Sequence, residues 1–88
     1  MGIMECSENG TPIQLVFDCV QKGTHEINTT DGKTLRSVLK ILSKRINTPY
    51  SEIANVLYNY NILDQKRTIQ ELNLPNGAVI LIKFKPYN

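Results

Sequence analysis

The first periodic segment of the chain alternates between apolar and polar residues. From Pro12 onward, one side of the alternation holds Ile13, Leu15, Phe17 and Cys19, and the other holds Gln14, Val16 and Asp18. A period of two predicts a strand with one buried face. Residues 21–23 predict a turn, and Thr24 to Thr29 predicts a second strand with Ile27 facing inward. The two strands therefore form a predicted β-hairpin.

A helical period follows the hairpin. Apolar residues recur at three- and four-residue spacing, namely Leu35, Val38, Leu39, Leu42 and Ile46. This stripe predicts a helix of about three turns that packs on the sheet, because burying each large side chain contributes roughly 1.5 to 3 kcal/mol. Thr34 is the predicted N-cap, and Asn47 with Pro49 beyond it ends the helix. The outer face is expected to hold Arg36, Lys40, Ser43 and Lys44.

Residues 49–60 admit two interpretations. In the first, Thr48 caps a second helix with Pro49 at its first position, and Ile53, Val56, Leu57 and Tyr60 have helical spacing. In the second, an irregular segment through Ile53 leads into a strand from Asn55 to Asn59. We favour the strand, because Val56 to Tyr58 is rich in strand formers and turn formers follow it.

The last third of the chain predicts several short elements and one longer strand. Ile62 to Asp64 predicts a short strand, residues 65–66 a turn, Arg67 to Leu72 a capped single turn of helix, and residues 74–77 another turn. The final strand runs from Ala78 to Lys85. In it Ile80, Ile82 and Phe84 face one way, and Val79, Leu81, Lys83 and Lys85 face the other.

This order of elements resembles ubiquitin and ubiquitin-like domains. The sharpest part of the resemblance is LDQKRTIQELNL, Leu63 to Leu74, and the whole spans about Ile13 to Lys85. It implies an α+β fold, a β-grasp roll with a mixed sheet of four to five strands packed on one main helix plus a short helical turn. Residues 12–86 would form the domain, with a flexible leader at 1–11 and a tail at 87–88.

The resemblance also implies where function lies. Ubiquitin-like domains commonly carry a small apolar patch on the exposed sheet face, and the matching positions here are Leu57, Tyr60, Val79 and Leu81, with Lys83 as a basic residue at the edge. The predicted function is a non-enzymatic binding module for protein-protein interaction, whose partner is another protein.

The end of the chain bears on conjugation. Conjugated relatives and the related sulfur carriers end in a flexible Gly-Gly, whereas this sequence ends in Phe84-Lys85-Pro86-Tyr87-Asn88. If Asn88 is the native C-terminus, we expect a non-conjugated protein. Two alternatives stay open: a modifier precursor whose Gly-Gly lies beyond Asn88, and a small bacterial ubiquitin-like accessory protein of a secretion system.

A second candidate surface is basic. Lys33, Arg36, Lys40 and Lys44, with Arg45 beside them, form a run of positive charges without an acid between them. Such a stripe is typical of a solvated helix face, and the alternative is an anionic partner such as a phosphoinositide head group or RNA. Aromatic residues do not interleave the charges, which argues against nucleic acid.

Composition narrows the remaining function classes. With 88 residues and a net charge of +2, the chain predicts one small domain, and no apolar run is long enough to span a membrane. Cys6, expected in the leader, and Cys19, expected to be buried, form neither a disulfide framework nor a metal site. His25, the one histidine, faces the same way as Ile27 and is expected to be structural. We therefore expect an intracellular protein, cytoplasmic or nuclear, with no cofactor and no catalytic site.

Overall fold

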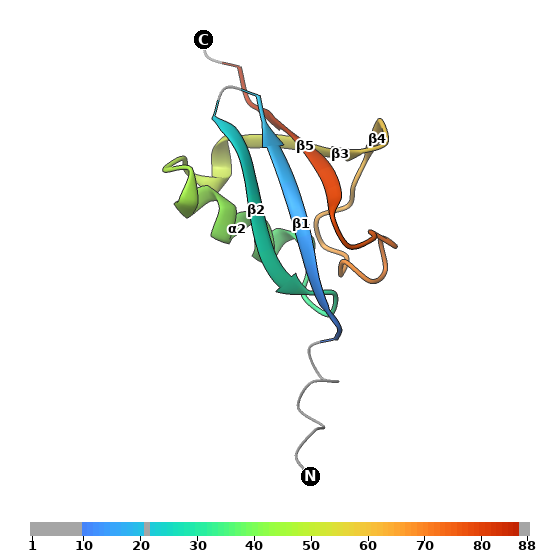
Figure 1. Ribbon diagram of the computed structural model, residues 1–88. Helices are drawn as coiled ribbons and strands as arrows, with labels where there is room; N and C mark the ends of the chain where they lie inside the picture. The colour runs from blue at the N-terminus through green and yellow to red at the C-terminus, as the bar shows by residue number, and fades with distance from the viewer. Residues whose placement is uncertain (1–9, 21, 87–88) are drawn as a thin grey trace.

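A single mixed sheet organises the molecule. The computed structural model describes residues 10–20 and 22–86. In chain order the elements are β1 (Pro12–Cys19), β2 (Gly23–Thr30), α2 (Leu35–Arg45), the 3₁₀ turn η1 (Tyr50–Glu52), β3 (Ile53–Tyr58), β4 (Asn61–Ile62) and β5 (Ala78–Phe84). The strand order is β2-β1-β5-β3-β4, with β1 and β5 parallel and the other pairs antiparallel. One helix lies across one face of this sheet, so the predicted α+β β-grasp architecture is confirmed (Figure 1).

The predicted hairpin is present and slightly longer than expected. β1 and β2 pair from Pro12 opposite Thr30 to Cys19 opposite Gly23, and Leu15 lies opposite Ile27. Thr11, assigned to the leader, continues this pairing: its N–H donates to Asp31 Oδ1 at 2.7 Å, and its C=O accepts from the Asp31 N–H at 2.9 Å. The predicted leader residues 1–9, Cys6 among them, and the predicted tail at 87–88 lie outside the described residues.

Helix α2 begins and ends where the sequence predicts. Thr34 Oγ1 accepts a hydrogen bond from the Ser37 N–H at 3.2 Å, which satisfies one of the free donors of the first turn. At the other end, Asn47 has a φ of 59°, and the Thr48 N–H donates to the Ser43 C=O at 2.9 Å. This is a Schellman-type ending, in which a left-handed residue lets the chain satisfy the last carbonyl groups.

Ser43 departs from the prediction. We expected it on the exposed face of α2, but only 7% of it is accessible, and its hydroxyl donates to the Lys40 C=O at 2.7 Å. Ser43 lies four residues after Leu39 and eight after Leu35, both fully buried, so it falls on the same side of the helix as these two residues. The polar hydroxyl is satisfied within the helix, so its burial needs no other partner.

The ambiguous segment is a strand. β3 starts at Ile53, two residues earlier than expected, because Ile53 already pairs with Phe84 of β5. A register shift between Ile53 and Asn55 marks a β-bulge, and the short helical stretch before it is the three-residue η1. A tight turn leads to β4, which spans Asn61–Ile62 and so is shorter than predicted.

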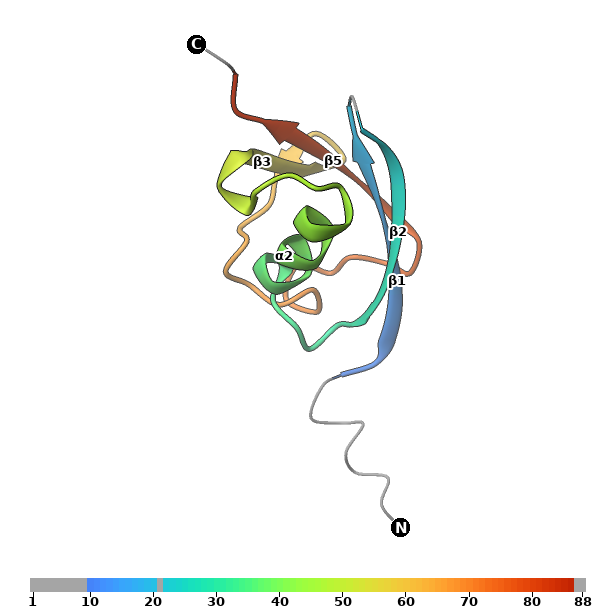
Figure 2. The same ribbon diagram turned by 90° about the vertical axis from the view of Figure 1, so that its left-hand side faces the viewer.

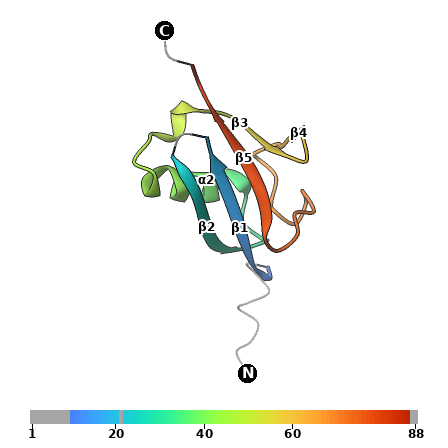
Figure 3. The same ribbon diagram turned by 45° about the horizontal axis from the view of Figure 1, so that its top comes forward.

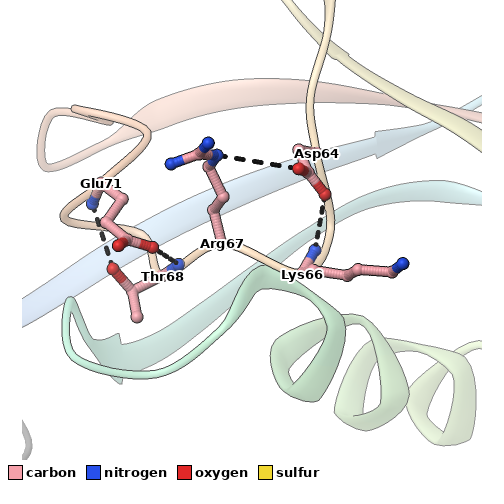
Figure 4. A network of polar contacts seen from close by, with 5 residues as sticks. All are labelled: Asp64, Lys66, Arg67, Thr68 and Glu71. Atoms are coloured by element: carbon pink, nitrogen blue, oxygen red, sulfur yellow. Dashed lines mark hydrogen bonds and ion pairs between the residues drawn. The ribbon is translucent and has the colours of Figure 1, made fainter.

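The connector between β4 and β5 holds the motif that carries the family resemblance. The predicted turn of helix over residues 67–72 is instead a series of turns with one helix-like bond, from the Leu72 N–H to the Thr68 C=O. Thr68 and Glu71 bond reciprocally: the Thr68 N–H donates to Glu71 Oε1 at 3.0 Å, and the Glu71 N–H donates to Thr68 Oγ1 at 3.1 Å (Figure 4). This is a capping box, so the predicted cap is confirmed although no helix continues from it.

Asp64 and Arg67 complete this connector. Asp64 Oδ1 accepts from the Lys66 N–H at 3.0 Å, and its other oxygen lies 3.7 Å from Arg67 Nε (Figure 4). The C=O of Arg67 then accepts from the N–H of Leu35, a free donor in the first turn of α2, at 3.0 Å. The motif therefore joins the connector to the start of the helix, and its role is structural.

The core lies between α2 and the sheet. All predicted inward residues of the strands and helix contribute to it, with Ile46, Tyr58, Leu63 and Phe84 packed at its margin. Its largest fully buried side chains are Leu15, Phe17, Ile27, Leu35, Leu39, Leu42, Ile69, Ile80 and Ile82.

Candidate interaction surface

The predicted docking residues lie on the sheet face that points away from α2. Figure 2 shows the helix and the connector on one side of the sheet, with no described element covering the other. In β5, Val79, Leu81 and Lys83 alternate with the fully buried Ile80 and Ile82. Side chains of a strand point to opposite faces in turn, so these three residues share the open face.

Strand register places the apolar residues of this face in two neighbouring rows. In the first row, Leu81 of β5 lies opposite Leu57 of β3, which in turn lies opposite Ile62 of β4. In the second row, two residues away along β5, Val79 lies opposite Val16 of β1. We call these two rows, together with the adjacent hairpin tip, the outer patch: Val16, Leu57, Tyr60, Ile62, Val79 and Leu81.

The outer patch has a half-buried centre and exposed flanks. Leu57 and Leu81 are partly covered by their neighbours, whereas Val79 is 57% exposed and Ile62 66% exposed. Exposed apolar side chains scattered singly over a surface need no explanation, but a contiguous group of them suggests an interface.

Two members of the outer patch were missed by the sequence prediction. Alternation already places Val16 on the outward face of its strand. It was overlooked as a site residue because Gln14 and Asp18, which share that face, are polar. Ile62 had no such signal, because a two-residue strand shows no period. Its side chain joins the outer patch only through its pairing with Leu57.

Tyr60 stands at the tip of the β3–β4 hairpin and is 98% exposed. Its φ is 66°, and that of the preceding Asn59 is 52°. Two-residue hairpin loops with both φ values positive favour Asn followed by Gly, so a tyrosine occupies the position that glycine normally takes. The other described non-glycine residues with positive φ, Asn47 and Asn73, are of the type that tolerates this conformation. Tyr60 is therefore both strained and exposed.

Lys83 is exposed next to Leu81, as expected for the edge of the patch. It lies opposite Asn55 on β3. The edge is not purely basic, however, because Asp18 of β1 lies opposite Leu81. The outer patch is thus bordered by charges of both signs.

The basic residues of the second candidate surface do not all belong to one helix face. Lys33 precedes the cap Thr34 and so lies outside α2. Arg36, Lys40 and Lys44 are spaced four residues apart on the helix, and all three are exposed. The ammonium group of Lys40 lies 5.9 Å from the centre of the Tyr50 ring, within reach of a cation-π contact.

Arg45 contacts the edge of the sheet. Its guanidinium donates to the backbone C=O of Glu26 on β2, which is the edge strand next to the helix. An edge carbonyl without a partner is a site for unwanted strand pairing, and a positive side chain on it protects the edge. The guanidinium of Arg45 is therefore engaged by β2, and we do not count this residue in the second candidate surface.

His25 and Cys19 have structural surroundings. The Nε2 atom of His25 lies 2.8 Å from the Lys22 C=O, to which it can donate, and the residue is half-buried. Cys19 is a buried free thiol, as predicted. Burial raises the pKa of the Cys19 thiol above its ordinary value of 9.0, and the nearby negative charge of Asp18 adds to the rise while Lys22 opposes it.

Within residues 10–20 and 22–86, no group of three His, Cys, Asp or Glu side chains is close enough to hold a metal ion. In the same part of the chain, no helix has the length and apolar character needed to cross a bilayer.

The fold has clear counterparts among solved structures. A de novo designed protein based on ubiquitin superposes with a TM-score of 0.75 at 17% sequence identity, over 88% of this chain and 93% of that one. The ubiquitin-like domain of an Arabidopsis thaliana protein, solved by NMR, gives a TM-score of 0.77 at 19% identity, over 89% of this chain and 82% of that one. No protein-family model matches the sequence, and a search of curated proteins finds no match. The fold of this chain is thus that of ubiquitin-like domains.

Proposed function

We propose that this protein is a non-enzymatic interaction module that binds a protein partner through its outer patch. The observation that carries the proposal is the group of apolar side chains, in two neighbouring rows on four strands, on the face away from α2. These side chains add nothing to the core between the sheet and the helix. Their burial by a partner would contribute about 25 cal/mol per Å² of apolar surface removed from water.

Tyr60 supports the same proposal. A left-handed backbone costs about 1 to 2 kcal/mol for a residue with a side chain, and the ring of Tyr60 makes no compensating burial within the described residues. Strain of this kind is often kept for function. Tyrosine is also among the residues that most often dominate binding energy at interfaces. We therefore assign Tyr60 as the anchor of the interface.

The absence of an enzymatic role is part of the proposal. Ubiquitin-like domains generally act by binding, and the two residues with catalytic side-chain chemistry considered above, His25 and Cys19, are engaged in hydrogen bonding or buried. We place the protein inside the cell, in the cytoplasm or nucleus, because Cys19 is a free thiol, as is usual in reducing compartments.

A matched pair of variants tests the surface. Val79→Glu places a charge in the outer patch, and Ile41→Glu makes the same kind of change at a residue of similar exposure, 45%, on the helix. Proteins captured from an extract of the source cells are quantified by mass spectrometry for wild type and both variants. We expect a defined set of partners that wild type and Ile41→Glu retain and that Val79→Glu loses by at least tenfold. Loss from both variants, or from neither, would refute the outer patch as the docking surface.

Tyr60→Gly supplies a second test that destabilisation cannot mimic. Glycine relieves the strained backbone, so this variant stays folded, yet it removes the proposed anchor. We expect at least a tenfold fall in capture of the same partners. Unchanged capture would remove Tyr60 from the interface.

A further inference from the structure

The end of β1, the segment after α2 and the end of β5 come together at one end of the molecule (Figure 3). Residues at or next to these three segments and the start of β2 line a groove there. Its volume is about 690 Å³, within the range of roughly 300 to 1,000 Å³ found for ligand sites. We call it the end groove. It contacts the outer patch at one residue position only, since Lys83 borders both.

Positive charge dominates the walls of the end groove. Lys22, Lys83 and Lys85 line it together with one acidic side chain, Glu52. All three lysines are exposed, and none takes part in an ion pair; the one ion pair among the described residues joins Arg67 and Asp64, in the β4–β5 connector. Three positively charged residues that line one groove attract negative charge to it.

Backbone structure fixes the position of two of these lysines. The Lys85 N–H donates to the Glu52 C=O at 2.8 Å, which holds the end of β5 against η1. Lys83 precedes it by two residues, so the extended backbone sets their Cα atoms roughly 6.6 to 7 Å apart on one side of the strand. That spacing matches alternate residues of an extended peptide.

The end groove also offers apolar surface. Val20, 65% exposed, lies in the β1–β2 turn, and Pro49 and Phe84 line the groove with it. A ligand that fits both properties carries carboxylates around an apolar side chain. The basic side chains here are lysines, which meet an anion as point charges, whereas the planar guanidinium of arginine favours bidentate phosphate binding.

We infer that the end groove binds an acidic peptide segment in extended form, with one apolar side chain against Val20. This site is separate from the outer patch, so a substitution can weaken binding at one of them and leave binding at the other unchanged. It would let one small domain hold a partner, or two partners, at two places.

The test uses a fluorescein-labelled nine-residue peptide with six Asp or Glu residues around a central Leu. A second peptide replaces every acid by its amide. Fluorescence anisotropy at low salt should show binding of the acidic peptide alone, with affinity that falls as salt screens the charges. Replacing the central Leu by Gly should weaken binding severalfold.

Two double variants, each of which reverses two positive charges, show where the peptide binds. Lys22→Glu with Lys85→Glu alters the groove, and Lys33→Glu with Arg36→Glu makes the same change at the start of α2. We expect the first pair to raise Kd at least tenfold, and the second pair and Val79→Glu to leave it within twofold. No binding by wild type, or equal weakening by both charge-reversed pairs, would overturn the inference. So would tighter binding to an RNA oligonucleotide or to anionic vesicles that needs the same two lysines.

Discussion

The two faces of the sheet are made by the same strands and meet different surroundings. On the inner face, Phe17, Ile80 and Ile82 are fully buried against α2. On the outer face, their immediate neighbours Val16, Val79 and Leu81 are also apolar, but no described element covers them. Packing in the core therefore explains the apolar side chains on the inner face only.

The largest expected effect comes from truncating one residue on each face. Ile80→Ala removes a fully buried side chain and should lower the free energy of unfolding by about 2 to 5 kcal/mol. Val79→Ala, one position earlier and 57% exposed, should change it by no more than about 0.5 kcal/mol. Chemical denaturation of both variants measures the difference. Similar losses would mean that the outer face also contributes to the core.

A smaller effect is expected at the hairpin tip. Tyr60→Gly should raise the free energy of unfolding by about 1 kcal/mol, because relief of the left-handed strain exceeds the extra chain entropy of glycine. Asn73→Gly is the control, since Asn tolerates its φ of 56° and should gain only a few tenths of a kcal/mol. Denaturant titration distinguishes the two. Destabilisation by Tyr60→Gly would show that the ring supports the fold.

The smallest expected effect is on the pH dependence of the free energy of unfolding, through the buried thiol of Cys19. The pKa of Cys19 is raised on folding, so above pH 9.0 the unfolded chain loses this thiol proton while the folded protein keeps it. The free energy of unfolding should therefore fall as pH rises above 9.0 towards the folded pKa, and Cys19→Ala should remove that part of the slope. Denaturation curves between pH 8 and 10 provide the measurement, and identical slopes would contradict the prediction.

Periodic segments were predicted well because each is packed on one side only. The stripe from Leu35 to Ile46 and the alternation in β1 and β5 follow directly from burial against a single partner layer. The prediction for Ser43 was wrong because the residue is polar, although it lies four residues after the buried Leu39 and shares that side of the helix. A stripe defined by apolar residues alone omits a polar residue at the same spacing.

The uncertainty over residues 49–60 has a specific physical cause. The inward residues Ile53, Val56 and Tyr58 are separated by three positions and then by two, because a bulge follows Ile53. Buried residues three positions apart are typical of a helix, so this spacing within a strand can be mistaken for a helical one. One inserted residue was therefore enough to make both interpretations fit.

The candidate site was predictable in part. Strand alternation places Val79, Leu81 and Lys83 on one face, and the resemblance to ubiquitin-like domains adds Leu57, which lies opposite Leu81 in the structure. The addition of Ile62 and the formation of the end groove depend on which strands and turns become neighbours. Those contacts join segments far apart in the chain, and no local pattern contains them.

The parallel pairing of β1 with β5 has a consequence for how the domain is made. These are the first and last strands in the part of the chain that the structure describes, yet they are central neighbours in the sheet, with Leu15 opposite Ala78. On the ribosome, the β1–β2 hairpin and α2 can form early, but the sheet cannot close until β5 has emerged. Contacts between such distant segments also slow folding. Because Val79 and Leu81 arrive with β5, the outer patch is assembled only in the completed domain.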